Sequence, residues 1–315
     1  MNELASIIEN NPHLKMNSLI QKAIFLIDEF IPEGSKQFFY ENLKTLKLIK
    51  ETKPVLGSYY PENNTLGINM EVIFSVLEKR RIEIDENVFR EYLLGTLTHE
   101  LLHLASSNLK EKKYGVSENE NVNRSFNEGI TEYFSLIIAN QESISSYKLY
   151  DVKFVSLVVE LLGIDFIKAN YFNALGSQNI KTELSKLEKI SRQGSKLNEI
   201  PHIIDSMCEY SDLANVVEKK KDSIFTNAVT PALIAIEKEI SGMLWNLFDV
   251  RIKDDIYLYK ISSVNDLGKR MELIQNLFPC EFVDFDIERF VLLEKECNDL
   301  LNLNIAEDQI SKGSL

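Results

Sequence analysis

Two histidines one helical turn apart form the pattern in this sequence that most clearly suggests chemistry. In the run His99-Glu100-Leu101-Leu102-His103, a helix would place both imidazoles on one face, where they can bind the same metal ion. Two of the four histidines in the chain lie here. The alternative is a surface or half-buried helix that carries two histidines by coincidence.

A second polar segment, from Asn127 to Glu132, can supply a third metal ligand. It has helical spacing of its own, so Glu128 and Glu132 are expected one turn apart on the same side of a helix. Glu128 can reach a metal held by His99 and His103. Glu132 can accept the free ring N–H of a ligating histidine, which fixes the imidazole tautomer.

The two motifs together resemble those of the gluzincins, the thermolysin-like superfamily of zinc peptidases. In that family a His-Glu-x-x-His helix is followed by a helix that carries a glutamate ligand in an Asn-Glu-x-x-Ser-Asp motif. The second motif is matched here by Asn127, Glu128, Thr131 and Glu132, with Thr for Ser and Glu for Asp. The resemblance covers residues 55–141 and implies a zincin-like core with Asn127 and Glu132 supporting the ligands.

The resemblance also has an implication for the substrate. It implies that the strand around Thr65 to Met70 runs above the cleft and offers its edge to an extended peptide. The substrate is then a peptide or a protein. Endopeptidase and aminopeptidase activities both remain open at this point.

The metzincins share the first motif but require a glycine and a third histidine at fixed positions after it. Here Ser106 stands where the glycine is required, and Leu109 stands where the third histidine is required. The sequence therefore favours a glutamate as the third ligand.

The predicted chemistry is hydrolysis of a peptide bond with Zn²⁺ as cofactor. Three protein ligands leave one position on zinc for a water, and Glu100 is expected to act as the general base on that water. A donor that stabilises the oxyanion is also expected. The candidates for it are Tyr147, Tyr150, Tyr171, Arg192 and His202.

Two other readings compete with an active peptidase. A structural zinc site would be closed by a fourth protein ligand and would have no use for Glu100 between its two histidines. The second is an inactive or latent zinc-binding protein whose helical region binds a protein partner in a regulatory role. The intact set of ligands and base favours the enzyme.

Composition narrows the possible partners. The net charge of −13 argues against nucleic acid, because binding a polyanion requires a positive surface. The widely spaced Cys208, Cys280 and Cys297 fit reduced thiols, and no stretch has the length and apolar character of a membrane helix, so we expect a cytoplasmic protein. The sequence leaves the oligomeric state open.

The elements that must hold the motifs can be predicted from periodicity. Residues 17–50 read as two helices that are broken at Pro32 and Gly34. Residues 55–60 and 65–70 read as a β-hairpin around a turn at 61–64. The first motif lies on a helix that begins near residue 88 after Asp85 or Asn87, residues 106–124 read as a loop, and the second motif lies on a helix over 125–141.

Beyond residue 142 nearly every segment reads as helix, including one that begins at Thr230 and Pro231. We therefore predict an α+β fold that is predominantly α-helical, with a small zincin-like core and a short sheet. The predicted organisation consists of a helical segment (1–50), the catalytic core (51–141), a helical subdomain forming the other cleft wall (142–305) and a flexible tail (306–315). The helices expected after residue 142 cover 148–162, 164–175, 180–193, 198–219, 230–248, 264–277 and 284–302.

Overall fold

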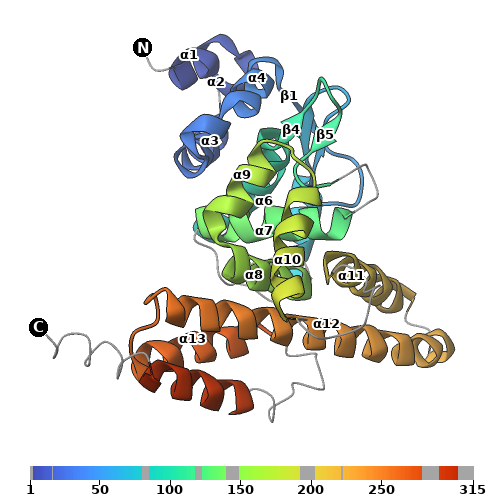
Figure 1. Ribbon diagram of the computed structural model, residues 1–315. Helices are drawn as coiled ribbons and strands as arrows, with labels where there is room; N and C mark the ends of the chain where they lie inside the picture. Colours follow the sequence, from blue (N-terminus) through green and yellow to red (C-terminus); the bar gives the residue numbers. More distant parts are fainter. Residues whose placement is uncertain are drawn as a thin grey trace, which may run out of the picture. The chain divides into compact units, whose positions relative to one another are not determined.

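The computed structural model describes residues 3–15, 17–79, 85–117, 123–139, 149–191, 203–220, 223–278 and 291–303 (Figure 1). The chain divides into two compact units. Unit 1 comprises Met1–Lys148 and Ile164–Asn179, and unit 2 comprises Leu149–Gly163 and Ile180–Leu315. The prediction of a predominantly helical α+β fold with a short sheet is confirmed. The tail over 306–315 lies outside the described residues.

Unit 1 begins with short helices. Asn17 caps the longest of them, because its side chain accepts a hydrogen bond from the Ile20 N–H at 3.1 Å. The interruption predicted at Pro32 and Gly34 is a single 3-10 turn. These elements are α1 (Glu3–Asn10), α2 (Pro12–Lys15), α3 (Ser18–Phe30), η1 (Glu33–Ser35) and α4 (Gln37–Thr45).

A three-stranded sheet follows, and its strand order decides which edge is free. The strands are β1 (Lys47–Lys50), β2 (Gly57–Tyr60) and β3 (Thr65–Ile68), in the order β1-β3-β2. The predicted hairpin is confirmed, since β2 pairs antiparallel with β3. The implication that β3 offers a free edge is wrong, because β3 also pairs with β1. The free edge on the hairpin side belongs to β2.

The first motif lies on α6 (Glu86–Ala105) and the second on α7 (Arg124–Ala139). α6 packs against α3, α4, α7 and β2, so it is the central helix of unit 1. The segment predicted as a loop after α6 also contains a small hairpin of β4 (Ser107–Asn108) and β5 (Lys113–Tyr114). Two further helices complete unit 1, α5 (Met70–Lys79) and α9 (Ile164–Phe172).

Aromatic side chains fill the core of unit 1 beneath the motif helices. Phe134 of α7 stacks on Phe172 of α9 with ring centroids 5.8 Å apart, and Phe30 of α3 meets Phe134 edge to face at 5.1 Å. Such pairs add to the stabilisation that burial of the rings provides. The core therefore fixes α7 from the side opposite its polar residues.

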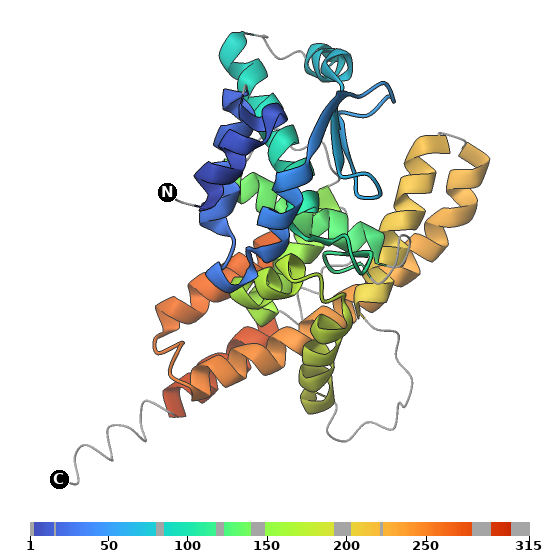
Figure 2. The ribbon, with the colours of Figure 1, turned by 90° about the horizontal axis from the view of Figure 1, so that it is seen from above.

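Unit 2 is helical throughout its described residues, with α8 packed against α11, α12 and α13. α11 and α12 lie side by side (Figure 2). The prediction that a helix begins at Pro231 is wrong, because Pro231 lies at an exposed position inside α12. The elements are α8 (Leu149–Leu162), α10 (Gln178–Ser191), α11 (Ile203–Lys220), α12 (Ser223–Tyr257), α13 (Val264–Leu277) and a helix over 291–303.

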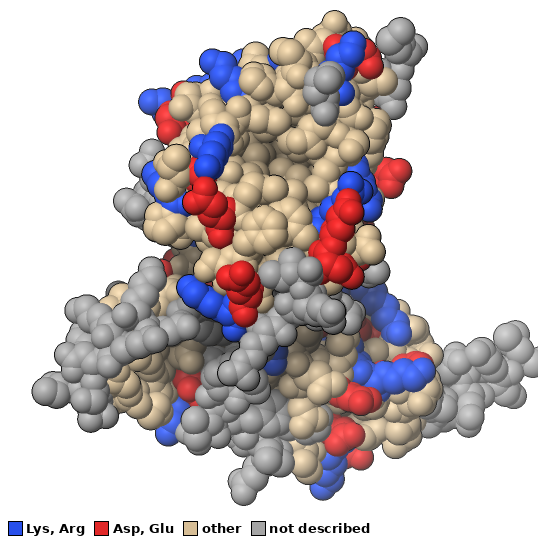
Figure 3. Space-filling view, turned by 180° about the vertical axis from the view of Figure 1, so that it is seen from behind, with Lys and Arg blue, Asp and Glu red and all other residues tan. Residues whose placement is uncertain are grey.

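Acidic and basic side chains are mixed on the surface. They lie next to one another on the face that Figure 3 shows. Exposed ion pairs such as Lys15–Glu9 and Lys50–Glu71 contribute little to stability in water. None of the described helices combines the length and the apolar composition needed to cross a bilayer.

Candidate metal centre

Two of the predicted ligands are held on α6. Asp85 caps this helix, because its carboxylate accepts a hydrogen bond from the Val88 N–H at 2.8 Å. The C-terminal half of α6 is anchored in the core by side chains such as Leu101, which is fully buried. His99 and His103 lie one turn apart there, and both imidazoles approach the same carboxylate of α7.

α7 brings the third predicted ligand to these histidines. Its residues Ile130 and Phe134 are fully buried in the aromatic core, which sets the rotation of the helix. Glu128 and Glu132, one turn apart, therefore face α6. The amphipathic pattern of α7 thus positions two carboxylates at one helix surface.

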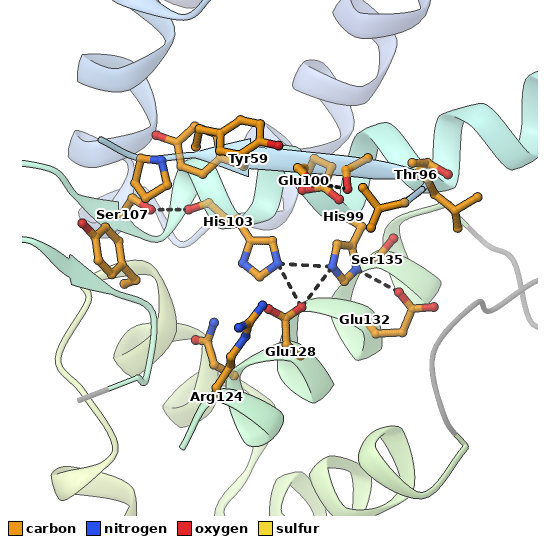
Figure 4. A pocket seen from close by; sticks show the side chains of 18 of the residues that line it. Tyr59, Thr96, His99, Glu100, His103, Ser107, Arg124, Glu128, Glu132 and Ser135 are labelled. Atoms are coloured by element: carbon orange, nitrogen blue, oxygen red, sulfur yellow. Dashed lines mark hydrogen bonds and ion pairs between the residues drawn. The ribbon is translucent and has the colours of Figure 1, made fainter. Parts of the chain in front are cut away.

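The structure brings together His99, His103 and Glu128 in a small triangle (Figure 4). The Nε2 atom of His103 lies 3.2 Å from His99 Nε2 and 3.2 Å from Glu128 Oε2. His99 Nε2 lies 3.4 Å from the same Glu128 oxygen. Ligand atoms at 2.0–2.1 Å from a tetrahedral zinc ion lie about 3.3 Å apart. The three side chains therefore fit a zinc ion without rearrangement of the helices.

Glu132 holds the imidazole of His99 from behind. Its Oε2 atom lies 2.9 Å from His99 Nδ1, and both side chains are buried. Since the carboxylate accepts the Nδ1 proton, the lone pair of Nε2 is directed at the other two ligand atoms. Glu132 thus lies where an orienting partner of a ligand is required.

The electrostatics of the triangle favour positive charge at its centre. Burial disfavours the charged form of His99, but hydrogen bonds with Glu128 and Glu132 outweigh burial and raise the pKa of His99 to about 10 in the metal-free protein. Burial likewise opposes ionisation of Glu128, but the two imidazoles hold the pKa of its carboxyl well below the usual range. A cation, either a proton or a metal ion, is therefore stabilised between these groups.

Glu100 lies beside the triangle, against the edge strand β2. Its side chain is buried, which raises the pKa of the carboxyl, and the backbone N–H of Tyr59 donates a hydrogen bond to it. A Cβ atom added at Gly57 would lie 2.9 Å from Glu100 Cγ, so only glycine leaves room for this carboxylate. A carboxylate with a raised pKa beside a metal site is suited to accept a proton near neutral pH.

These residues line a pocket of about 980 Å³ that lies within unit 1. α6 and α7 form one wall, and β2 with the loop that precedes it forms the other. Figure 4 shows Thr96 at one end of the pocket and Ser107 at the other, with the two histidines between them. The pocket is long enough along α6 to receive an extended chain, because the part of α6 from Thr96 to its last residue, Ala105, alone spans about 14 Å.

Asn127 supports the pocket from the start of α7. Its Oδ1 atom accepts a hydrogen bond from the Val116 N–H at 2.9 Å. The adjoining Gly115 has φ +56°, and a Cβ there would collide with the Asn127 side chain. Asn127 therefore fixes the chain that follows β5 through its side-chain amide oxygen.

The candidates for an oxyanion donor fall in different places. The side chain of Tyr171 is fully buried behind α7, where its hydroxyl lies 2.7 Å from Thr131 Oγ1, and it does not line the pocket. Tyr147, Arg192 and His202 lie outside the described residues, and of Tyr150 the structure describes only the backbone.

Two parts of the pocket were missed by reasoning from sequence. The first is the edge strand β2, whose Gly57 and Tyr59 contact Glu100. The second is Arg124, which lines the pocket from the first turn of α7. Its spacing of four residues before Glu128 was a usable signal, since residues at i and i+4 share a helix face.

Among the residues that the structure describes, His99, His103 and Glu128 are the one group of three or more His, Cys, Asp or Glu whose ligand atoms lie within 4.8 Å of one another. Comparisons with protein-family models, curated proteins and solved structures each find no match to this chain. The chemistry of the pocket therefore follows from the positions of these side chains alone.

Proposed function

We propose that this protein is a zinc-dependent metallopeptidase of the gluzincin type, acting on peptides in the cytoplasm. The observation that supports the proposal is the convergence of two imidazoles and the Glu128 carboxylate at 3.2–3.4 Å, with Glu100 at the edge of the same pocket. A nitrogen-rich set of two histidines and one glutamate suits zinc, and three protein ligands are typical of catalytic zinc sites.

Each side chain has a distinct role in the proposed reaction. Zinc, when bound, supplies a Lewis acid and lowers the pKa of a coordinated water. Glu132 keeps His99 in the tautomer that can bind metal. Glu100 accepts the proton of the attacking water and later delivers it to the amine that leaves.

The strand β2 offers backbone groups to an extended peptide. The Asn69 N–H donates to the Leu56 carbonyl at 2.9 Å, so this pair is hydrogen-bonded and every second pair after it is too. The backbone groups of Gly57 and Tyr59 therefore point away from β3, on the side where Glu100 lies. Because the Tyr59 N–H donates to Glu100, a peptide that adds to this edge as a further strand would pair with the remaining outward groups, such as the Tyr59 carbonyl, with its scissile bond beside Glu100.

The substitution Glu100→Gln tests the proposal. It removes the proton acceptor and leaves the three ligands in place, so we expect one zinc ion per chain to be retained and cleavage of a peptide library to fall about 10²- to 10⁴-fold. Zinc is measured by inductively coupled plasma mass spectrometry and cleavage by mass spectrometry of the products. Glu91→Gln is the matched control, because Glu91 is exposed on the same helix.

The possible outcomes separate the competing functions. Full zinc with no cleavage by either the wild type or Glu100→Gln would favour the inactive zinc-binding protein. If the wild type bound no zinc, the proposal of a metal centre would be wrong. Equal cleavage by both proteins would show that Glu100 is not the general base.

A further inference from the structure

Arg124 places a guanidinium group in the metal pocket. It is the first residue of α7 and lies one turn before Glu128, and it lines the pocket while remaining exposed to solvent. Figure 4 shows its side chain extending into the pocket beside Glu128 and below His103. A cation at this position can touch a substrate that is bound at the metal.

The guanidinium has no partner within the part of the chain that the structure describes. No ion pair or hydrogen bond joins it to Glu128, although the two side chains are neighbours on one helix face (Figure 4). Lys53, the other lysine or arginine of the pocket lining, is engaged with Tyr60, whose ring centroid lies 4.6 Å from its Nζ atom. Arg124 thus differs from Lys53 in having its donors available.

The position of Arg124 also works against the helix that carries it. The N-terminus of a helix is the positive end of its dipole, so a cation in the first turn is unfavourable there. The first turn of α7 contains no acidic residue that would offset the arginine. A residue that breaks a local rule inside a pocket is better explained by a ligand than by the stability of the helix.

We propose that Arg124 binds a carboxylate of the substrate, so that the pocket selects acidic peptides. This inference rests on the proposed peptidase function. A guanidinium pairs with a carboxylate through two parallel N–H···O bonds, which gives both strength and direction. The net charge of −13 by itself disfavours acidic peptides, so selection of them requires a local cation such as Arg124.

The direction of β2 indicates which carboxylate this is. The strand runs from Gly57, which contacts Glu100, towards Tyr59, whose hydroxyl donates to Asn64 at 2.9 Å and lies close to Ser107. Arg124 lies near the Ser107 end of the pocket (Figure 4). A peptide paired antiparallel to β2, the more stable arrangement, places residues N-terminal to the scissile bond at this end. The carboxylate is then an Asp or Glu side chain on that side.

The experiment compares matched peptides in the zinc-loaded protein. One pair carries Glu or Gln N-terminal to the cleaved bond, with an amidated C-terminus, and a second pair is neutral with a free or an amidated C-terminus. We expect the wild type to prefer Glu over Gln about 10- to 100-fold in kcat/KM, through KM. Arg124→Gln should bring the ratio near one, and Arg124→Glu should favour a further peptide that carries Lys at the same position. Arg90→Gln is the control, because Arg90 is exposed on α6 and pairs with Glu86.

The same peptides are titrated into zinc-loaded Glu100→Gln by calorimetry, with and without Arg124→Gln. This binding measurement tests Arg124 even if no form of the protein cleaves, an outcome that would overturn the peptidase function alone. The alternative result is that the wild type prefers the peptide with a free C-terminus and that Arg124→Gln abolishes this preference. That result would support carboxylate binding by Arg124 and identify the carboxylate as the C-terminus of the peptide.

Three results would overturn the inference. The first is the absence of any carboxylate preference in binding and in cleavage. The second is a preference that Arg124→Gln leaves intact. The third is a loss of zinc, or an equal fall of kcat on all peptides, in Arg124→Gln, because either would show that Arg124 acts on Glu128 or on the reacting carbonyl.

Discussion

Each unit of the molecule contains a cluster of charged groups around a buried carboxylate, and the two clusters are balanced in opposite ways. In unit 2, the Asp255 cluster consists of Asp255, Glu160, Arg251, Lys260 and Arg270. The buried carboxylate of Asp255 lies 3.5 Å from Arg251, 3.4 Å from Lys260 and 3.8 Å from Arg270. Glu160 forms an ion pair with Arg270. Acids in this cluster are neutralised by basic side chains.

In unit 1, the groups that face the carboxylates of Glu128 and Glu132 are the imidazoles of His99 and His103. Glu100 adds a third carboxylate to the same pocket. Burying several acids together is costly unless a cation accompanies them. The comparison supports the proposal that the pocket of unit 1 receives a cation from solution, whereas the acids of the Asp255 cluster have basic side chains as partners.

The largest effect is expected from removal of a ligand. The free energy of zinc binding to a protein site is about 10–16 kcal/mol and is divided among a few ligands. Because His103→Ala removes one of these ligands, zinc affinity should fall about 10²- to 10³-fold. Asp255→Asn should leave zinc affinity unchanged and lower the free energy of unfolding by about 1–3 kcal/mol, because the half-buried guanidinium groups of Arg251 and Arg270 lose a charged partner. Competition with a chromogenic chelator measures zinc affinity, and urea titration measures unfolding.

The same pair of variants can break the comparison. If Asp255→Asn lowered zinc affinity as much as His103→Ala, the two clusters would not be separate electrostatic systems. If His103→Ala kept full affinity, the triangle would not be the metal site.

A smaller effect is expected from Glu132→Gln, which keeps the shape of the side chain but removes its charge. Glutamine can still accept the Nδ1 proton of His99, so the tautomer survives while the imidazole becomes a weaker ligand. Zinc affinity should fall about 10- to 100-fold, measured by the same competition. Loss comparable to that of His103→Ala would instead identify Glu132 as a ligand.

The smallest effect is expected at Glu51, a buried acid of a third kind, whose carboxylate is stabilised by hydrogen bonds. Its carboxylate accepts hydrogen bonds from the backbone N–H of Lys53, the Tyr60 hydroxyl at 2.6 Å and the backbone N–H of Thr52, and these lower its pKa below 4.5. A pKa that is lower in the folded state stabilises the fold above the unfolded value, and this contribution disappears as pH falls through the folded value.

Glu51→Gln should therefore lower the free energy of unfolding by about 1 kcal/mol at pH 7, and the difference should shrink as pH falls below 4.5. Urea titrations of the metal-free protein from pH 7 to pH 3 measure this. A difference that grows with acidity would show that hydrogen bonds to the ionised carboxylate are not the cause.

Much of unit 1 could be predicted from sequence because its signals are local. The Asp85 cap and the turn residues at 61–64 each specify a local feature through nearby side chains. The proximity of His99, His103 and Glu128 followed from helical spacing and the resemblance of the two motifs. These are features in which a few neighbouring residues decide the geometry.

The parts that could not be predicted depend on pairing between distant segments. Residues 47–50 continue an apolar pattern after α4, and only their pairing with β3 makes them a strand. That same pairing makes β2 the edge, which no property of the hairpin reveals. Pro231 read as a helix start because proline is favoured there, whereas packing of α12 against α8 and α11 carries the helix through it.

Gly57 ties the pairing of the hairpin to the proton chemistry of the pocket. A shift of one residue between β2 and β3 would bring Leu56 or Ser58 to this position, where a Cβ atom would lie 2.9 Å from Glu100 Cγ. A molecule misfolded in this way would still present its three candidate ligand atoms, yet Glu100, the proposed general base, would be displaced. The rate of cleavage per bound zinc ion would then be proportional to the fraction of molecules in which β2 and β3 are paired in the native register.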